Sequence, residues 1–129
     1  HNTETVPRLY KKARPGGRYP RVKEIFRFAK DYAPQIPTKT GIILGLGETN
    51  EEILATMVDL RTVDVDILTL GQYLRPSSDH IELDRYVTPA EFAMFREEGM
   101  KMGFRHVESG PLVRSSYHAW EQVQAAGVS

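Results

Sequence analysis

Three short polar segments, each following an apolar stretch, carry the side chains that could do chemistry in this sequence. The first, residues 45–49, reads Gly-Leu-Gly-Glu-Thr, and its two glycines allow the backbone to approach a planar ligand closely. An equally good interpretation is a tight turn that places the acid Glu48 near a helix N-terminus. The segment lacks the Lys-Ser/Thr ending of a phosphate loop and any Gly-x-Gly-x-x-Gly pattern. It therefore disfavours a nucleoside triphosphate and a Rossmann-bound dinucleotide.

The other two segments offer an amide, an aromatic ring and a guanidinium. In Gly71-Gln72-Tyr73-Leu74 the amide and the ring suit hydrogen bonding to a base and stacking on it, although Tyr73 would equally well cover the core. Arg114, beside Ser115 and Ser116, suits a carboxylate or phosphate, and a deprotonated serine oxygen can ligate iron. Hydroxyls at a helix start are more often caps, so the residue types alone favour a cap here.

Metal ligands are scarce in this chain. It contains no cysteine, so it can itself form no disulfide, thiolate metal site or thiol nucleophile. Its four histidines are scattered and show no paired helical spacing of the zinc-protease kind. We therefore predict no histidine metal site, and any iron–sulfur chemistry must borrow its thiolates.

Length and charge fit one domain that acts on small molecules or proteins. The chain has 129 residues, with 17 Lys and Arg against 17 Asp and Glu, so neither nucleic acid nor an anionic membrane is an expected partner. No apolar run is long enough to cross a bilayer, and no signal or transit peptide is visible. A bacterial cytoplasm and an organelle matrix both fit. The opening His1-Asn2 leads us to expect a fragment of a longer reading frame.

Alternating helical and apolar patterns predict an α/β fold. We expect strands at 38–46, 67–73 and 104–108, and helices at 6–13, 20–32, 50–62, 89–102 and 115–125. Capping boxes at Thr49/Glu52 and Thr88/Glu91 mark two helix starts, and Gly103 marks one helix end.

The connections between these elements predict a parallel sheet. Strands that alternate with helices need right-handed crossovers, which leave the carboxyl ends of the strands as the place for a ligand. The first apolar run, 38–46, shows no polar alternation, so we expect a central strand covered on both faces. The pattern does not separate half of a βα barrel from a small open sheet.

Beyond single motifs, the sequence resembles lipoyl synthases along nearly its whole length. It also contains the radical S-adenosylmethionine (SAM) pattern Gly-x-Ile-x-Gly-x-x-Glu as Gly41, Ile43, Gly45 and Glu48. The motifs that carry the resemblance are His1-Asn2-x-Glu4-Thr5-Val6-Pro7-Arg8-Leu9-Tyr10, Arg14-Pro15-Gly16, Thr38-Lys39-x-Gly41, Gly45-Leu46-Gly47-Glu48-Thr49-x-Glu51-Glu52, Leu70-Gly71-Gln72-Tyr73-Leu74-x-Pro76-Ser77, Arg85-Tyr86-Val87-x-Pro89-x-Glu91-Phe92 and Gly110-Pro111-Leu112-Val113-Arg114-Ser115-Ser116-Tyr117-His118-Ala119.

The resemblance implies a fold and a reaction. Residues 1–129 would be the C-terminal part of a radical SAM domain, about the last three βα units of a partial (βα)6 barrel, with the 114–119 segment included. The full-length enzyme would use SAM and two [4Fe-4S] clusters to insert two sulfur atoms at C6 and C8 of an octanoyl chain. That chain would be carried by a lipoyl-carrier protein or domain, and electrons would come from a donor such as a flavodoxin or ferredoxin.

The resemblance also assigns residues. Gly41, Ile43, Gly45 and Glu48, together with Gln72, Tyr73 and Leu74, would frame the SAM adenine. Asn2, at the end of a preceding strand, would contact the ribose. Arg114 would lie beside the auxiliary cluster, and Ser115 would ligate its iron.

The chain departs from the family pattern at Thr3, Thr40, Arg75 and Trp120, and none of these removes an expected ligand. The absent cysteines matter more, because the chain alone should then hold no cluster. Two alternatives stay open. One is a non-catalytic remnant that binds a carrier protein or a SAM-like nucleotide, and the other is an unrelated half-barrel that dimerises through its sheet edges.

Overall fold

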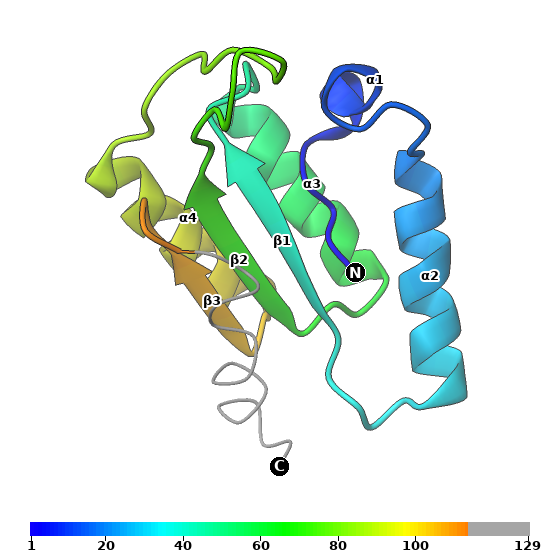
Figure 1. Cartoon of the computed structure of the whole chain (residues 1–129). Helices are drawn as coiled ribbons and strands as arrows, with labels where there is room; N and C mark the ends of the chain where they lie inside the picture. The colour runs from blue at the N-terminus through cyan, green and yellow to red at the C-terminus, as the bar shows by residue number, and fades with distance from the viewer. Residues whose placement is uncertain (114–129) are drawn as a thin grey trace.

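The computed structural model of the chain describes residues 1–113, which form an α/β structure around a three-stranded parallel sheet (Figure 1). The strands are β1 (Lys39–Leu44), β2 (Ile67–Gln72) and β3 (His106–Ser109), in the spatial order β1-β2-β3. The helices are the 3-10 turn η1 (Pro7–Leu9), α1 (Tyr10–Ala13), α2 (Tyr19–Tyr32), α3 (Asn50–Thr62) and α4 (Pro89–Met102). The predicted α/β class and parallel sheet are confirmed.

Local signals in the sequence set the starts of α3 and α4. At each start a threonine hydroxyl accepts the N3 amide hydrogen, and the N3 glutamate accepts the threonine amide hydrogen, at Thr49/Glu52 and Thr88/Glu91. Gly103 ends α4 in the left-handed conformation at φ 102°, where a side chain would be strained. Both capping boxes and this helix end were predicted, and they fix the helices against the strand ends.

The position of β1 differs from the prediction of a central strand. β2 is the central strand, because it pairs with β1 on one side and with β3 on the other. Among residues 1–113, the outer edge of β1 is met by a short parallel bridge, in which Glu4 pairs with Ile42. Both β1 and β2 are apolar runs, and apolar content reports burial rather than the order of strands in a sheet.

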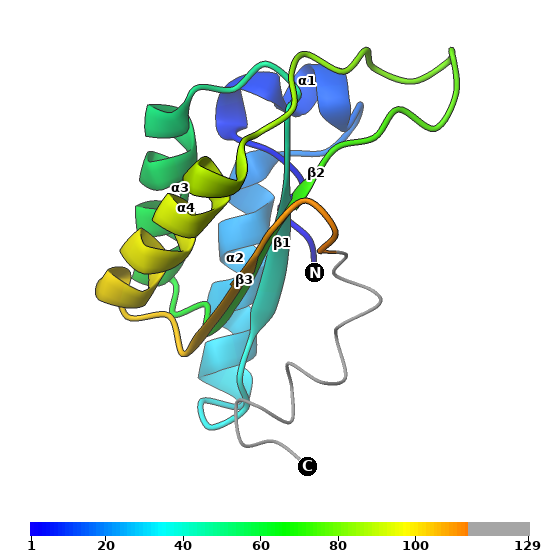
Figure 2. The ribbon, with the colours of Figure 1, turned by 90° about the vertical axis from the view of Figure 1, so that its left-hand side faces the viewer.

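Helices cover one face of the sheet in the described part of the chain (Figure 2). On that face the strand residues Ile42, Leu44, Leu68 and Leu70 are buried in one core with helix residues. Two of these helix residues are Phe92 and Phe95 of α4. The opposite face was also predicted to be covered. No described helix lies on it, but the strand residues there are buried, among them Gly41, Ile67, Thr69 and Gly71.

The remaining element boundaries agree with the predictions to within a few residues. The first strand is shorter than the predicted 38–46, the third starts later than 104, and the predicted helix 6–13 divides into η1 and α1. The predicted helix 115–125 lies outside the described residues, as do Arg114 and Ser115. Among residues 1–113, no helix is both long enough and apolar enough to span a membrane.

Candidate ligand-binding site

The carboxyl ends of β1 and β2 lie side by side and bring two of the predicted segments together. Leu44 and Gln72 are partners in the parallel register, and the Tyr73 amide donates a hydrogen bond of 2.7 Å to the Leu44 carbonyl oxygen. Residues 45–49 leave from one strand and residues 73–74 from the other. Gly45 and Tyr73 are therefore at the same end of the sheet, where parallel α/β folds bind ligands.

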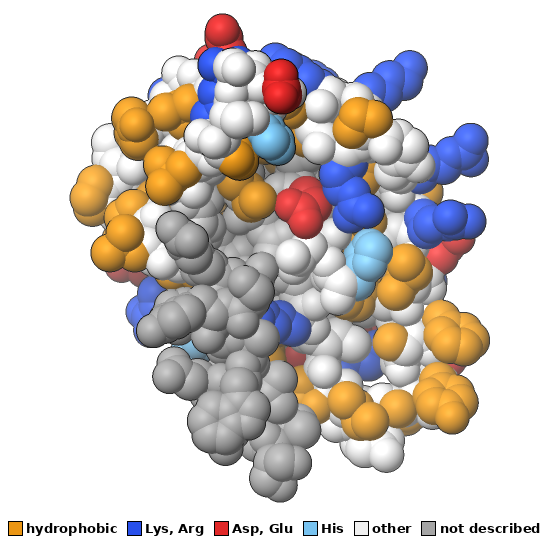
Figure 3. Space-filling model, viewed as in Figure 1, with side chains coloured by type: hydrophobic (Ala, Val, Ile, Leu, Met, Phe, Trp, Pro, Cys, Tyr) orange, Lys and Arg blue, Asp and Glu red, His pale blue; other side chains and the backbone are white. Residues whose placement is uncertain are grey.

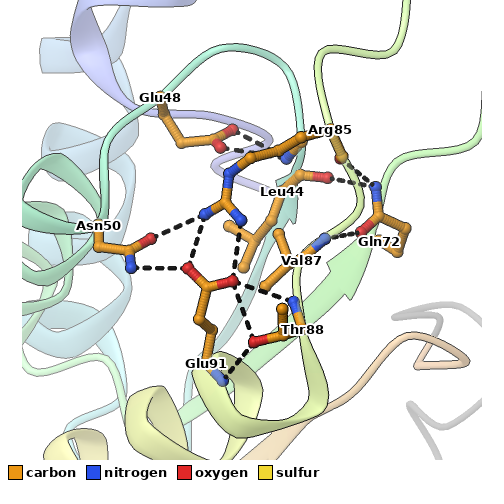
Figure 4. Close-up of polar contacts among 9 residues, drawn as sticks. Leu44, Glu48, Asn50, Gln72, Arg85, Val87, Thr88 and Glu91 are labelled. Atoms are coloured by element: carbon orange, nitrogen blue, oxygen red, sulfur yellow. Dashed lines mark hydrogen bonds and ion pairs between the residues drawn. The ribbon is translucent and has the colours of Figure 1, made fainter.

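Gln72 braces this end of the sheet (Figure 4). Its side-chain nitrogen lies 3.0 Å from the Tyr73 carbonyl oxygen, 3.1 Å from that of Arg85 and 3.3 Å from that of Leu44. Its side-chain oxygen accepts a 2.8 Å hydrogen bond from the Val87 amide. One amide side chain thus holds both strand ends and the segment that leads into α4.

Gly45 is required by the close approach of the chain to itself. Its φ is +102°, and a Cβ at this position would lie 2.5 Å from both the Arg85 carbonyl oxygen and the Gln72 side-chain nitrogen. The Gly45 carbonyl oxygen also accepts a 2.8 Å hydrogen bond from the Asp84 amide. A close backbone approach was expected at this glycine. The structure shows that it is approached by residues 83–85 of the protein itself, called the returning segment below.

Glu48 turns back into its own loop. Its side chain is only 5% exposed, and its carboxylate accepts hydrogen bonds from the amides of Gly45 and Leu46 at 3.1–3.2 Å (Figure 4). Burial raises the pKa of the Glu48 carboxyl above its ordinary value, although these amides and the charge of Arg85 oppose the change. These hydrogen bonds make Glu48 part of a tight turn. A tight turn was one of the two interpretations of this segment in the sequence.

An ion-pair network behind the loop was not predicted. Arg85 donates to both carboxylate oxygens of Glu91 at 2.8 Å and to the Asn50 side-chain oxygen at 3.1 Å, while the Asn50 amide donates to Glu91 at 2.8 Å. The Arg85 guanidinium holds the pKa of the Glu91 carboxyl well below its usual range. The network joins the N-termini of α3 and α4 (Figure 4). In the sequence, Glu91 was identified only as the acid of a capping box, and Arg85 only as part of a motif shared with lipoyl synthases. Neither pattern indicated that the two side chains pair.

In front of the strand ends lies a mainly apolar hollow of about 300 Å³. The Tyr73 hydroxyl donates to the Ile81 carbonyl oxygen at 2.6 Å, which fixes the ring, while Leu74 is 54% exposed and Leu112 is 86% exposed. Such a hollow with a few polar groups suits a planar heterocycle. The residues that line it are Ile43, Gln72, Tyr73, Leu74, Pro76, Pro111, Leu112 and Val113.

The turn after β3 closes one side of this hollow. The Gly110 amide donates to the Leu70 carbonyl oxygen at 3.0 Å, and the Val113 amide donates to Gly110 at 3.2 Å. A Cβ on Gly71 would lie 2.4 Å from the Val113 carbonyl oxygen, so only glycine allows the turn to cross β2. Leu112 and Val113 were not among the predicted site residues, and the only signal was the Gly-Pro turn directly after a strand.

The predicted site residues fall into four groups. Ile43, Gln72, Tyr73 and Leu74 line the hollow, while Gly45 and Glu48 form the loop beside it. Gly41 lies further down β1, paired with Thr69, and Asn2 directly precedes Thr3, whose amide donates to the Thr40 hydroxyl near the start of β1. Arg114 and Ser115 lie outside the described residues. Ligand contact by any of these residues stays a prediction.

Among residues 1–113 no group of three His, Asp or Glu side chains is placed to hold a metal ion. Together with the lack of cysteine, this means that the described residues do not fit an iron–sulfur cluster. They do fit an apolar, planar group bound at the strand ends.

The fold and the hollow define a parallel α/β protein with a ligand site at the carboxyl ends of its strands. Comparison with curated proteins gives the family. A lipoyl synthase of Koribacter versatilis (strain Ellin345) is 62% identical over 125 residues, which are 97% of this chain and 41% of the relative. One of Rubrobacter xylanophilus is 58% identical over 126 residues, 98% of this chain and 39% of the relative.

A lipoyl synthase of Haemophilus ducreyi is also 58% identical, over 127 residues, which are 98% of this chain and 38% of the relative. These identities show that the chain is homologous to lipoyl synthases over almost its whole length. It spans about 40% of the length of these relatives. That share is consistent with the expected correspondence to their C-terminal part. No protein-family model matches the chain.

Proposed function

We propose that this chain is the adenosine-binding and C-terminal part of a lipoyl synthase, which uses SAM to insert two sulfur atoms at C6 and C8 of a protein-bound octanoyl chain. Two observations together support the proposal: the chain is 62% identical to a lipoyl synthase, and an apolar hollow lies at its strand ends. In this proposal the three parallel βα units continue into a partial (βα)6 barrel.

The hollow has the composition that an adenine ring requires. Ile43, Leu74 and Leu112 offer apolar contacts to a flat ring, and Tyr73 borders the same hollow. Bound SAM supplies the radical that removes hydrogen from the octanoyl chain. The described residues would bind and orient its nucleoside and exclude water from it.

The two [4Fe-4S] clusters of the proposed enzyme need thiolates that this chain lacks. The described residues therefore supply no cluster ligand, and Ser115 is proposed as a single additional oxygen ligand beside Arg114. We expect the chain alone, incubated with iron and sulfide, to show no [4Fe-4S] absorbance. The carrier protein and the electron donor would meet the complete enzyme, in the cytoplasm of a bacterium or in an organelle matrix.

The activity is tested in a fusion. The chain is joined behind the part of the Koribacter versatilis lipoyl synthase that it does not match, and the reconstituted fusion is given SAM, reductant and an octanoylated carrier domain. We expect 5'-deoxyadenosine and lipoyl product. A correctly reconstituted fusion that forms neither would contradict the proposal.

Two variants of the fusion test the hollow. Leu74→Arg places a long charged side chain in the hollow at a half-exposed position, and should raise the KM for SAM about tenfold or more. Tyr86→Arg is the matched control, because Tyr86 is an exposed apolar residue of the same loop that does not line the hollow. Equal KM values for the two variants would remove the hollow from the SAM site.

A third variant addresses the cluster ligand. Ser115→Ala in the fusion should reduce lipoyl formation far more than 5'-deoxyadenosine formation, since the serine is assigned to the auxiliary cluster and not to SAM. The ratio of the two products is the measurement. An unchanged yield of lipoyl product would exclude this role for Ser115.

A remnant that binds a SAM-like nucleotide without catalysis remains the second candidate, because the hollow is present while the cysteines are absent. It predicts that the chain alone binds S-adenosylhomocysteine, and that the fusion binds it equally well but yields no lipoyl product.

A further inference from the structure

Arg8 joins segments that are far apart in the sequence. Its Nε donates to one Glu52 carboxylate oxygen at 2.8 Å, and one of its terminal nitrogens donates to the other oxygen at 2.9 Å. The same terminal nitrogen lies 2.9 Å from the Gly47 carbonyl oxygen and donates to it as well. One guanidinium therefore ties η1 to the loop 45–49 and to the first turn of α3.

The element that carries Arg8 is firmly packed. Its neighbours Leu9 and Tyr10 are buried, and the Tyr10 hydroxyl donates to the Thr3 carbonyl oxygen. The segment around Thr3 contains Asn2 and meets β1 through a parallel bridge. Arg8 is thus fixed relative to residues 2–5, and it extends from that fixed base to the loop.

The loop 45–49 needs such a restraint from outside. Gly45 and Gly47 have φ values of +102° and +115°, and glycine loses more conformational freedom on folding than any other residue. Glu48 holds the first half of the loop, because its carboxylate accepts from the amides of Gly45 and Leu46. A Cβ on Gly47 would meet nothing within 4 Å, so packing does not hold the second half. The hydrogen bond from Arg8 does.

The contact supplies geometry rather than stability. The Arg8 side chain is 56% exposed, and exposed ion pairs add little to stability because water screens them. Two parallel bonds to one carboxylate fix the orientation of the guanidinium plane, and the third bond sets where the Gly47 carbonyl lies. Arg8 also holds the pKa of the Glu52 carboxyl at about 2, so the pair is fully charged near neutral pH.

Arg8 does not border the hollow at the strand ends. It lines a separate groove of about 560 Å³ between η1, α2 and α3, together with residues such as Tyr19 and Val58. The residues that line the hollow do not include it. Arg8 therefore acts on a ligand in the hollow through the loop and not by direct contact.

Arg8 also differs from the cations around it. Figure 3 shows basic side chains over the region of α1 and the start of α2. Lys11 and Lys12 of α1 are exposed, and no ion pair among residues 1–113 includes them. Lys11 is therefore a matched control for the loss of one positive charge in this region.

We propose that Arg8 is a positioning residue for SAM, which fixes the loop 45–49 relative to residues 2–5 so that both meet the nucleoside at a set spacing. Without Arg8 the loop populates conformations that do not bind, and the apparent affinity falls in proportion to the binding-competent fraction. This inference rests on the proposed function, because Asn2 and the turn from Gly45 to Glu48 are there assigned to SAM.

Equilibrium binding of S-adenosylhomocysteine to the fusion, measured by calorimetry, tests the proposal. Arg8→Ala should weaken binding about tenfold or more, and should raise the KM for SAM by a similar factor with little change in kcat for 5'-deoxyadenosine formation. Lys11→Ala controls for charge. Lys23→Ala controls for the loss of an ion pair, because Lys23 pairs with Asp59 at 2.8 Å between α2 and α3. Both controls should bind like the wild type.

Two conservative variants separate geometry from charge. Arg8→Lys keeps the positive charge but lacks the planar fork, so its affinity should stay closer to that of Arg8→Ala than to the wild type. Glu52→Gln keeps an acceptor for the Thr49 amide and leaves the contact with Gly47 in place, so it should weaken binding less than Arg8→Ala. Wild-type affinity in Arg8→Lys would show that charge alone suffices, and the proposal would be wrong.

Amide hydrogen exchange of the ligand-free fusion provides a readout that does not depend on SAM. Arg8→Ala should speed exchange at residues 46–49 about tenfold, while the interior of α3 keeps its wild-type rates. Equal acceleration in the loop and in α3 would mean that Arg8 only stabilises the fold, which contradicts a positioning role.

The binding measurement also separates the two proposals. If the wild-type fusion binds S-adenosylhomocysteine and Arg8→Ala binds it equally well, this inference is overturned and the proposed function stands. A wild-type fusion that binds no S-adenosylhomocysteine would contradict the proposed function, and this inference with it.

Discussion

The strand ends and the outer side of α2 both carry charged and apolar side chains, but their charges are satisfied differently. This outer side, the α2 outer face, carries the exposed residues Ile25, Phe28 and Tyr32, with Arg14, Arg18 and Arg21 toward its N-terminal end. At the strand ends Arg85 binds both oxygens of Glu91, and the buried Glu48 accepts amide hydrogens from its own loop. On the α2 outer face Arg14 has no carboxylate partner among the described residues, and Phe28 is exposed. The difference indicates that the charged groups at the strand ends are held by partners within the described residues, whereas the α2 outer face adds little to the packing of those residues. Substitutions should therefore be costly in one region and cheap in the other.

Among the substitutions that test this comparison, control variants apart, Gly45→Ala should give the largest loss of stability. The alanine Cβ would lie 2.5 Å from the Arg85 carbonyl oxygen at a φ of +102°, so backbone strain and overpacking together should cost about 3 kcal/mol. Gly47→Ala is the matched control, since Gly47 has φ +115° but nothing within 4 Å, and should cost about 1 kcal/mol. Urea unfolding followed by circular dichroism measures both. Equal losses would mean that the returning segment does not hold the strand ends.

The sequence predicted what local residues determine. The starts of α3 and α4 follow from hydrogen bonds between Thr49 and Glu52 and between Thr88 and Glu91, which need only three residues of spacing. The meeting of Ile43 with residues 72–74 was also predictable, because parallel strands end at the same edge.

Contacts between residues far apart in the sequence could not be predicted from such local patterns. Gln72 reaches Arg85 and Val87 across 13 and 15 residues, and Arg85 reaches Asn50 across 35. The crossing of β2 by the turn that ends at Val113 likewise depends on where β3 packs. The central place predicted for the first strand was wrong for the same reason, because an apolar run does not determine which neighbours a strand will have.

Gln72→Ala should give the second-largest effect. It removes the acceptor of the Val87 amide and the donor to the Arg85 carbonyl oxygen, so two partly buried backbone groups lose their partner at a cost of about 2 kcal/mol. Gln35→Ala, at an exposed position after α2, is the control and should change stability by less than about 0.5 kcal/mol. Similar unfolding midpoints for the two variants would show that Gln72 is not a brace.

The pKa values of two glutamates near the first loop should be shifted in opposite directions. The hydrogen bond from Arg8 lowers the pKa of Glu52 from 4.5 to about 2, while burial raises the pKa of Glu48 above 4.5. Ionised Glu52 therefore stabilises the fold above pH 4.5, and its contribution is lost as pH falls from 4.5 to about 2. Ionisation of Glu48 has the opposite sign and lowers stability as pH rises from 4.5 through its folded pKa.

Carboxyl NMR of the chain measures both midpoints directly. Arg8→Ala is the diagnostic variant, because it should return the Glu52 midpoint toward 4.5 and leave that of Glu48 nearly unchanged. Glu48 titrating below Glu52 would contradict the burial of Glu48 that distinguishes this loop.

The smallest effect is expected on the α2 outer face. Phe28→Ser and Tyr32→Ser should each change the stability of the chain by no more than about 0.5 kcal/mol, because both side chains are exposed and serine has a similar helix propensity. Phe26→Ser, on the buried side of the same helix, should cost about 4 kcal/mol. If the two outer variants destabilise the chain as much as Phe26→Ser does, their rings already pack within this chain. The contrast between paired charges at the strand ends and an exposed α2 outer face would then be wrong.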